Sequence, residues 1–211
     1  MSPSNAIIYV VDDDSSVRTA VKRLIRSLGF TVETFDSAQA FLNHEPHDGP
    51  ACLVLDIRMP GTSGIQLQEQ LAKADVQIPI IFITGHGNIP MSVKAMKAGA
   101  VDFIEKPFED QKLIDAIQAA IARSKQFRTE QAEINELQLR ADSLTPREHE
   151  VFGLVVSGML NKQIAIDLGM SEKTVKIHRS RVMQKMKAAS LADLVRMAEK
   201  TIPSNSNRKS I

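Results

Sequence analysis

The sequence contains one cysteine and no apolar run long enough to cross a membrane. A single cysteine, Cys52, excludes an intramolecular disulfide and suits a reducing compartment. A bilayer span needs about 20 consecutive apolar residues, and no segment approaches that length. The three aspartates at 12–14 directly follow a short apolar stretch, which is unlike a secretory signal peptide. We therefore expect a cytoplasmic protein that does not associate with membranes.

Charge is unevenly distributed along the 211 residues, although the formal net charge is only +1. Residues 1–123 contain 11 Lys and Arg against 15 Asp and Glu, whereas residues 144–211 contain 12 against 6. A chain of this length fits two compact domains better than one small domain. An acidic first part and a basic last part indicate two domains that have different partners.

Five short apolar runs alternate with amphipathic segments in the first part of the chain. The runs cover residues 7–11, 31–35, 52–55, 80–83 and 101–104. Several are apolar at every position, which is typical of parallel strands that helices cover on both faces. The segments between the runs show helical spacing of apolar residues. This order predicts an α/β domain over residues 1–123, namely a (βα)5 flavodoxin-like sheet of order 2-1-3-4-5.

The remaining chain shows helical patterns only. Residues 124–141 are polar and contain no glycine or proline, so we expect a helical linker, with a disordered linker as the alternative. Thr145, Pro146 and Glu148 read as a helix N-cap, a first-turn proline and a capping-box glutamate. Helices are expected at about 145–157, 161–168, 172–187 and 190–200. The sequence thus predicts an all-α domain over 142–202 and a disordered tail over 203–211.

Polar side chains follow the successive strands of the first domain. Asp12 and Asp13 follow the first strand, Asp56 the third, Thr84 the fourth and Lys106 the fifth. Because the carboxyl ends of parallel strands meet at one edge of a sheet, we expect these side chains to converge. Taken singly, each is an ordinary loop, turn or strand-end residue. Their order along the sheet predicts an acidic pocket in which oxygen ligands favour Mg²⁺.

The pocket residues suit phosphoryl transfer. Asp56 is the candidate nucleophile, because aspartate forms acyl phosphates. Mg²⁺ and the ammonium of Lys106 would neutralise charge on the transferred group, and the Thr84 hydroxyl would donate to one of its oxygens. A cis peptide bond between Lys106 and Pro107 would aim the lysine into the site.

Four motifs in this domain, VVDDD at 10–14, LVLDIRMPG at 53–61, ITGH at 83–86 and KPF at 106–108, resemble those of receiver domains in two-component response regulators. The resemblance covers about residues 5–123. It implies that Asp56 accepts the phosphoryl group and that Mg²⁺ is bound by four groups, which are the carboxylates of Asp12, Asp13 and Asp56 and the backbone carbonyl of Arg58. Within this set the resemblance makes Asp13 a direct ligand, whereas Asp12 acts largely through water.

The resemblance also implies a switch. Thr84 and Lys106 read the phosphoryl group, and Phe103 occupies the position of the switch aromatic, which turns inward when Thr84 moves. The alternative for Phe103 is an ordinary strand phenylalanine. Arg58 and His86 lie two residues beyond Asp56 and Thr84, where their side chains could screen the acyl phosphate from water.

The segment 172–186 predicts a helix with one apolar and one basic face. Val175, Val182 and Met186 share the apolar stripe, while residues 171–187 contain six basic residues and one acidic residue. A glycine at 169 and a serine at 171 supply the turn and the cap of a helix-turn-helix. A helix of about 15 residues spans roughly 22 Å and fits the DNA major groove. The alternative is a solvated basic face.

Three motifs, LTPRE at 144–148, NKQIA at 161–165 and TVKIH at 174–178, resemble the four-helix LuxR-type DNA-binding domain over about 142–200. Together the two domains resemble the FixJ/NarL class of regulators, nearest its FixJ-like branch. The resemblance places Lys176, Ile177 and Ser180 at the bases, although some relatives carry lysine at the position of Ser180. The full set of candidate DNA contacts is Asn161, Lys162, Lys173, Thr174, Lys176, Ile177, Arg179, Ser180, Arg181 and Lys185.

We therefore expect a phosphorylation-dependent transcriptional regulator of a two-component system. A sensor histidine kinase would phosphorylate Asp56, and phosphorylation would control homodimerisation and binding to double-stranded DNA, with RNA polymerase as a further candidate partner. The alternative is a phosphorylation-independent DNA-binding protein with a vestigial receiver, against which the intact set of pocket residues argues. An enzyme is not expected, because the site has no second base or substrate pocket and would assist only its own phosphorylation and hydrolysis.

Overall fold

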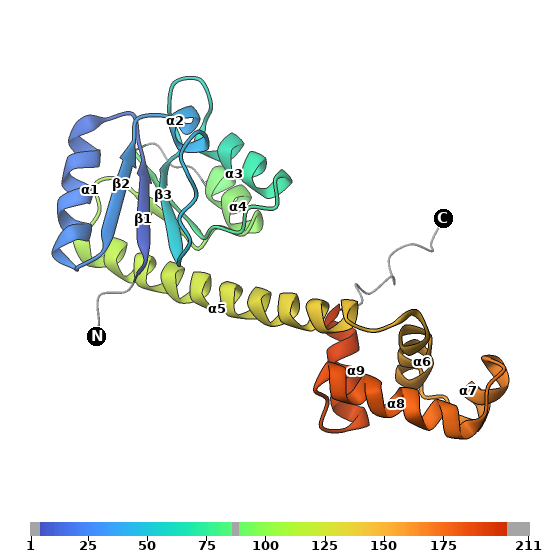
Figure 1. Ribbon diagram of the computed structural model, residues 1–211. Helices are drawn as coiled ribbons and strands as arrows, with labels where there is room; N and C mark the ends of the chain where they lie inside the picture. The colour runs from blue at the N-terminus through green and yellow to red at the C-terminus, as the bar shows by residue number, and fades with distance from the viewer. Residues whose placement is uncertain (1–4, 86–88, 202–211) are drawn as a thin grey trace. The chain divides into compact units, whose positions relative to one another are not determined.

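The computed structural model describes residues 5–85 and 89–201. The chain divides into two compact units, Met1–Arg128 and Thr129–Ile211. Figure 1 shows the helices and strands of both units, most of them labelled. The predicted disordered tail, 203–211, lies outside the described residues.

The first unit is built on a five-stranded parallel sheet of order β2-β1-β3-β4-β5. Its strands are β1 (Ile7–Val11), β2 (Thr31–Phe35), β3 (Ala51–Asp56), β4 (Ile80–Thr84) and β5 (Asp102–Glu105). Every residue of β1 and β4 is buried, as their unbroken apolar sequences predict for strands covered on both faces. The predicted α/β class and strand order are confirmed.

Helices cover both faces of this sheet. The helices are α1 (Ser15–Ser27), α2 (Ala38–Leu42), α3 (Gly64–Lys73), α4 (Ile89–Lys97) and α5 (Asp110–Asp142). One face packs against α1 and the first turns of α5, and the other face packs against α2, α3 and α4. The sequence does not reveal the bounds of α2, because five residues are too few for a helical apolar period.

The helix α5 continues without a break from the first unit into the second. It contains the whole of segment 124–141, for which a helical linker is expected. Leu113 and Ile117 near its start are buried in the core of the first unit, whereas Ala141 near its end belongs to the core of the second.

The second unit contains α6 (Pro146–Val156), α7 (Asn161–Asp167), α8 (Glu172–Met186) and α9 (Leu191–Thr201). A single apolar core holds these helices together, and it includes Val151, Ile164 and Val182. The predicted four-helix domain is confirmed. Among the helices that the structure describes, none combines the length and the apolar character that a membrane crossing requires.

Candidate functional site

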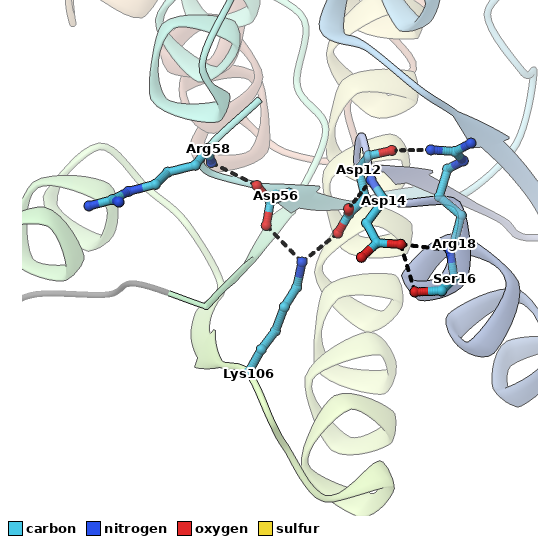
Figure 2. A network of polar contacts seen from close by, with 7 residues as sticks. All are labelled: Asp12, Asp14, Ser16, Arg18, Asp56, Arg58 and Lys106. Carbon is cyan, nitrogen blue, oxygen red and sulfur yellow. Dashed lines mark hydrogen bonds and ion pairs between the residues drawn. The ribbon is translucent and has the colours of Figure 1, made fainter. Parts of the chain in front are cut away.

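The strand register brings Asp12, Asp56 and Lys106 together at the carboxyl edge of the sheet. Val11 on β1 lies opposite Leu55 on β3, and the residue that follows each of them in the chain is an aspartate. The Lys106 Nζ lies 2.6 Å from Asp12 Oδ2 and 2.8 Å from Asp56 Oδ1. Figure 2 marks both contacts with dashed lines. One ammonium therefore contacts both carboxylates.

Burial and charge act in opposite directions on the candidate phosphoacceptor. Asp56 is 5% exposed, and this burial is the largest influence that raises the pKa of its carboxyl above the usual value. The hydrogen bond and the charge of Lys106 lower the pKa of Asp56, while the nearby Asp12 raises it. The main-chain N–H of Arg58 also donates to Asp56 Oδ2 at 2.7 Å. The carboxylate thus depends on Lys106 for its compensating charge.

The lysine keeps its proton in this pocket. Burial alone would lower the pKa of Lys106, but its hydrogen bonds to Asp12 and Asp56 outweigh that effect and hold the pKa above the usual value. The ammonium therefore stays charged at neutral pH. It can compensate further negative charge that arrives beside Asp56.

Thr84 lies at the end of β4, next to the start of the Lys106 segment. Thr84 is 1% exposed, and its main-chain carbonyl accepts a hydrogen bond from the Lys106 N–H at 2.7 Å. Thr84 lies opposite Glu105 in the strand register. The Lys106–Pro107 peptide bond is cis. The main-chain contact between Thr84 and Lys106 therefore places the end of β4 beside the lysine.

Lys106 contacts two of the three predicted carboxylates, those of Asp12 and Asp56. Asp13 is exposed, whereas Asp12 is 1% exposed. Within residues 5–85 and 89–201, no group of three or more His, Cys, Asp or Glu side chains is placed to hold a metal ion. Lys106 therefore joins two of the predicted carboxylates, and the participation of Asp13 in the same site stays a prediction.

The chemistry of the pocket nevertheless fits a hard cation. Asp12 Oδ2 and Asp56 Oδ1 are directed at one positively charged group. Carboxylate and main-chain carbonyl oxygens are the ligands that Mg²⁺ takes in proteins. The oxygen donors of this pocket therefore suit Mg²⁺.

The other predicted residues of this domain lie around the pocket. Phe103 is half-buried on the edge strand β5, opposite Phe82, and packs against the core on the α3 and α4 side of the sheet. The side chain of Arg58 is exposed. His86 lies outside the described residues.

Sequence reasoning did not identify a polar network at the start of α1. The Arg18 Nη1 donates to the main-chain carbonyl of Asp12 at 2.7 Å (Figure 2). Asp14 caps α1 by accepting hydrogen bonds from the Ser16 N–H at 2.7 Å and the Ser16 hydroxyl at 2.6 Å. A signal was present in the sequence, because a cation in the first turn opposes the helix dipole and so needs another partner.

The second unit exposes a basic face on α8. Ile177 is 46% exposed, whereas Val175 and Val182 are fully buried, which matches the predicted division of the helix into two faces. The Ser171 hydroxyl caps α8 by accepting the Thr174 N–H at 3.1 Å. The remaining exposed candidates on this helix are Lys173, Lys176, Ser180 and Arg181. Lys162 on α7 is also exposed.

Four candidate DNA contacts have side-chain partners within their own domain. The Thr174 hydroxyl lies 2.8 Å from the Ser171 hydroxyl. Arg179 Nη1 donates to Asn161 Oδ1 at 3.0 Å, so these two candidates contact each other. Lys185 Nζ donates to Glu148 Oε2 at 2.6 Å and to the Ser143 carbonyl at 2.9 Å. The glutamate that binds the Lys185 ammonium is only 2% exposed, and a DNA contact by Lys185 stays a prediction.

Glu148→Gln will destabilise the second unit. The hydrogen bond from Lys185 is the largest of the influences that lower the pKa of Glu148 to about 2, and the Thr145 N–H adds to it. Because the folded pKa is depressed, the stabilisation is fully present above the unfolded pKa of about 4.3 and is lost as pH falls towards 2. We expect a loss of about 1.5–3 kcal/mol at pH 7, typical of a hydrogen bond between charged groups.

Amide hydrogen exchange of α6 and α8 in the full chain, measured between pH 3 and pH 7, checks this prediction. The matched control is Glu150→Gln, which removes an exposed ion pair with Arg147 and should change protection by less than about 0.5 kcal/mol. Equal protection in the Glu148→Gln and Glu150→Gln variants at pH 7 would contradict it.

Both units match known protein families. Residues 8–118 match the response regulator receiver domain, and residues 142–198 match the luxR family of bacterial regulatory proteins. Nodulation protein W of Bradyrhizobium diazoefficiens is 51% identical over 93% of this chain and 86% of that protein. Transcriptional regulatory protein FixJ of Rhizobium meliloti is 46% identical over 90% of this chain and 94% of that protein.

A solved structure of response regulator StyR aligns with a TM-score of 0.80 at 51% identity, over 92% of this chain and 98% of that chain. The similarity therefore extends over both units. The predicted family is confirmed: the chain belongs to the transcriptional response regulators of two-component systems, in which a receiver domain is joined to a LuxR-type DNA-binding domain.

Proposed function

We propose that phosphorylation of Asp56 controls DNA binding by the LuxR-type domain. The observation that carries this proposal is the contact of one ammonium, from Lys106, with the buried carboxylates of Asp12 and Asp56. An Asp56 carboxylate oxygen forms a bond to the phosphorus of a phosphohistidine on a sensor histidine kinase. The bond from phosphorus to the histidine nitrogen breaks, and its electron pair stays on the imidazole.

The other groups of the pocket stabilise the transferred phosphoryl group and orient Asp56. The Lys106 ammonium compensates charge on the phosphoryl oxygens, and the Thr84 hydroxyl donates to one of them. The Arg58 N–H holds Asp56 Oδ2 and so orients the carboxylate. Bound Mg²⁺ supplies further positive charge beside the phosphoryl group. The groups that we assign to it are the carboxylates of Asp12, Asp13 and Asp56 and the main-chain carbonyl of Arg58.

The signal then passes from Thr84 towards β5 and α4. In this proposal Phe103, which is half-buried on the edge strand, turns inward when Thr84 moves towards the phosphoryl group. The helix α4 exposes Ile89 by 80% and Val93 by 45%, which gives the receiver an apolar surface for homodimerisation. A dimer binds two DNA half-sites together and gains effective concentration. RNA polymerase is the further partner that we propose for the DNA-bound regulator.

Footprinting of genomic DNA with the full chain tests the proposal. The protein is incubated with Mg²⁺ alone or with Mg²⁺ and acetyl phosphate, and its concentration is varied. We expect protection of the same sites at roughly 5- to 150-fold lower protein concentration after phosphorylation, the usual range of coupling between two sites. Equal protection under the two conditions would instead support the phosphorylation-independent regulator with a vestigial receiver.

Lys176→Ala should weaken specific DNA binding more than non-specific binding. We assign the exposed Lys176 to a base edge, and loss of such a contact costs about 1–3 kcal/mol of discrimination. Binding to a footprinted site and to a scrambled duplex, measured over a range of salt concentrations, checks this. The control is Arg181→Ala, which should weaken binding to both duplexes equally. It should also reduce the slope of the logarithm of the binding constant against the logarithm of salt concentration by about one. Equal losses on both duplexes for Lys176→Ala would remove its base-reading role.

A further inference from the structure

The residue Asp12 is fixed at four points. Its N–H donates to the Phe35 carbonyl at 3.2 Å, and its Oδ1 accepts the Asp14 N–H at 2.9 Å. Its Oδ2 accepts from Lys106 Nζ at 2.6 Å. Its main-chain carbonyl accepts from Arg18 Nη1 at 2.7 Å. The last of these contacts comes from a side chain of α1, and Figure 2 marks it with a dashed line.

The contact from Arg18 fixes a peptide plane that also contains Asp13. The carbonyl of Asp12 and the N–H of Asp13 belong to one planar unit. The next peptide unit, between Asp13 and Asp14, is fixed by its own N–H, which donates to Asp12 Oδ1. Both planes that flank the Asp13 Cα are therefore held. The direction in which the exposed Asp13 side chain leaves the main chain depends on these two contacts.

The capping of α1 does not account for Arg18. Asp14 already caps this helix through the Ser16 N–H. A positive charge in the first turn of a helix is unfavourable in the field of its dipole. The half-buried guanidinium of Arg18 instead reaches back to the turn between β1 and α1. Its contact serves that turn rather than the helix.

We propose that Arg18 is a positioning residue for the divalent-cation site. By holding the peptide between Asp12 and Asp13, it directs the Asp13 carboxylate so that it joins Asp12 and Asp56 in binding the ion. This inference rests on the proposed function, because it concerns the same Mg²⁺ site. Positioning and charge have opposite effects here. Loss of a nearby cation alone would strengthen Mg²⁺ binding, whereas loss of the positioning contact weakens it.

Calorimetric titration of the full chain with Mg²⁺ alone tests the assignment. We expect Arg18→Ala to bind Mg²⁺ roughly 10- to 100-fold more weakly than the wild type, the range found when a residue that orients a metal ligand is removed. Arg18→Lys keeps the charge without the guanidinium and should fall between the two. The control is Arg26→Ala, which removes the same charge from an exposed position in the last turn of α1 and should bind as the wild type does.

A double-mutant cycle identifies the route of the effect. If Arg18 acts through Asp13, adding Arg18→Ala to Asp13→Asn should weaken Mg²⁺ binding by less than about twofold, because both changes remove the same ligand. Unchanged or tighter Mg²⁺ binding by Arg18→Ala overturns the assignment. If circular dichroism shows that Arg18→Ala is unfolded, the Mg²⁺ affinity of Arg18→Lys is measured instead. An affinity equal to that of the wild type then overturns the assignment. Failure of the wild-type chain itself to bind Mg²⁺ would overturn both this inference and the proposed metal site.

Discussion

Asp56→Asn will accept no phosphoryl group from acetyl phosphate and Mg²⁺, whereas the wild-type chain will be labelled on one residue. An amide does not form an acyl phosphate. The other two carboxylates that we assign to the pocket, Asp12 and Asp13, are placed differently from Asp56. Asp12 is buried and fixed at four points, while Asp13 is exposed. Asp56 alone lies at the end of β3 with both the Lys106 ammonium and the Arg58 N–H on its carboxylate.

Intact-mass spectrometry after incubation with acetyl phosphate measures the label, and borohydride reduction followed by peptide mapping locates it. The control Asp115→Asn changes an exposed carboxylate on α5 and should be labelled as the wild type is. Label at the wild-type level in Asp56→Asn, or label mapped to another residue of the wild type, would mean that Asp56 is not the acceptor.

Lys106→Met will destabilise the first unit by about 3 kcal/mol at neutral pH. Removal of one partner from a buried ion pair costs about 3–5 kcal/mol, and Lys106, whose side chain is 20% exposed, belongs at the lower end. The corresponding fall in the unfolding temperature is roughly 10 °C for a domain of this size. The cause is that Asp12 and Asp56 then face each other without a compensating cation.

The pH dependence of this loss follows from the carboxyl pKa. Burial already raises the pKa of Asp56, and the opposing influence of Lys106 disappears in the variant. A folded pKa above the unfolded value of about 3.9 means that the charged form costs stability at higher pH. The destabilisation is therefore largest above the folded pKa and vanishes as pH falls below about 4. Thermal unfolding of the full chain from pH 4 to pH 8 measures it.

Two variants separate this effect from a general loss of lysine. Lys94→Met removes an exposed ion pair with Glu69 and should change stability by less than about 1 kcal/mol. Adding Asp56→Asn to Lys106→Met removes one of the opposed carboxylates and should restore part of the lost stability. A pH-independent loss, or no restoration in the double variant, would show that Lys106 does not act by compensating these charges.

The fold and most of the pocket were predictable because they depend on order along the chain. Unbroken apolar runs specify strands that are covered on both faces, and the carboxyl ends of such strands meet at one edge. Asp56, Thr84 and Lys106 each lie at a strand end, so their convergence follows from topology. The division of α8 into a buried and an exposed face follows in the same way from helical spacing.

The distinction between Asp12 and Asp13 was not predictable in this way. They are adjacent and chemically identical, but Asp12 is buried, at 1% exposed, whereas Asp13 lies at the surface. Successive side chains at a strand end leave on opposite sides, and only the packed sheet shows which side faces Lys106. Likewise, the sequence does not distinguish Lys185 from the other basic residues on α8, whereas the fold brings Glu148 into contact with it.

The sequence by itself determined the two domains, the parallel sheet and the residues that end its strands, because periodicity and order are properties of the chain. Only the tertiary structure decided which charges meet. It paired Lys106 with two carboxylates, held Lys185 inside its own domain and joined Arg18 to the turn before α1. The physical reason is that a charge selects its partner by distance and burial after the elements have packed, and neither quantity can be read from spacing along the chain.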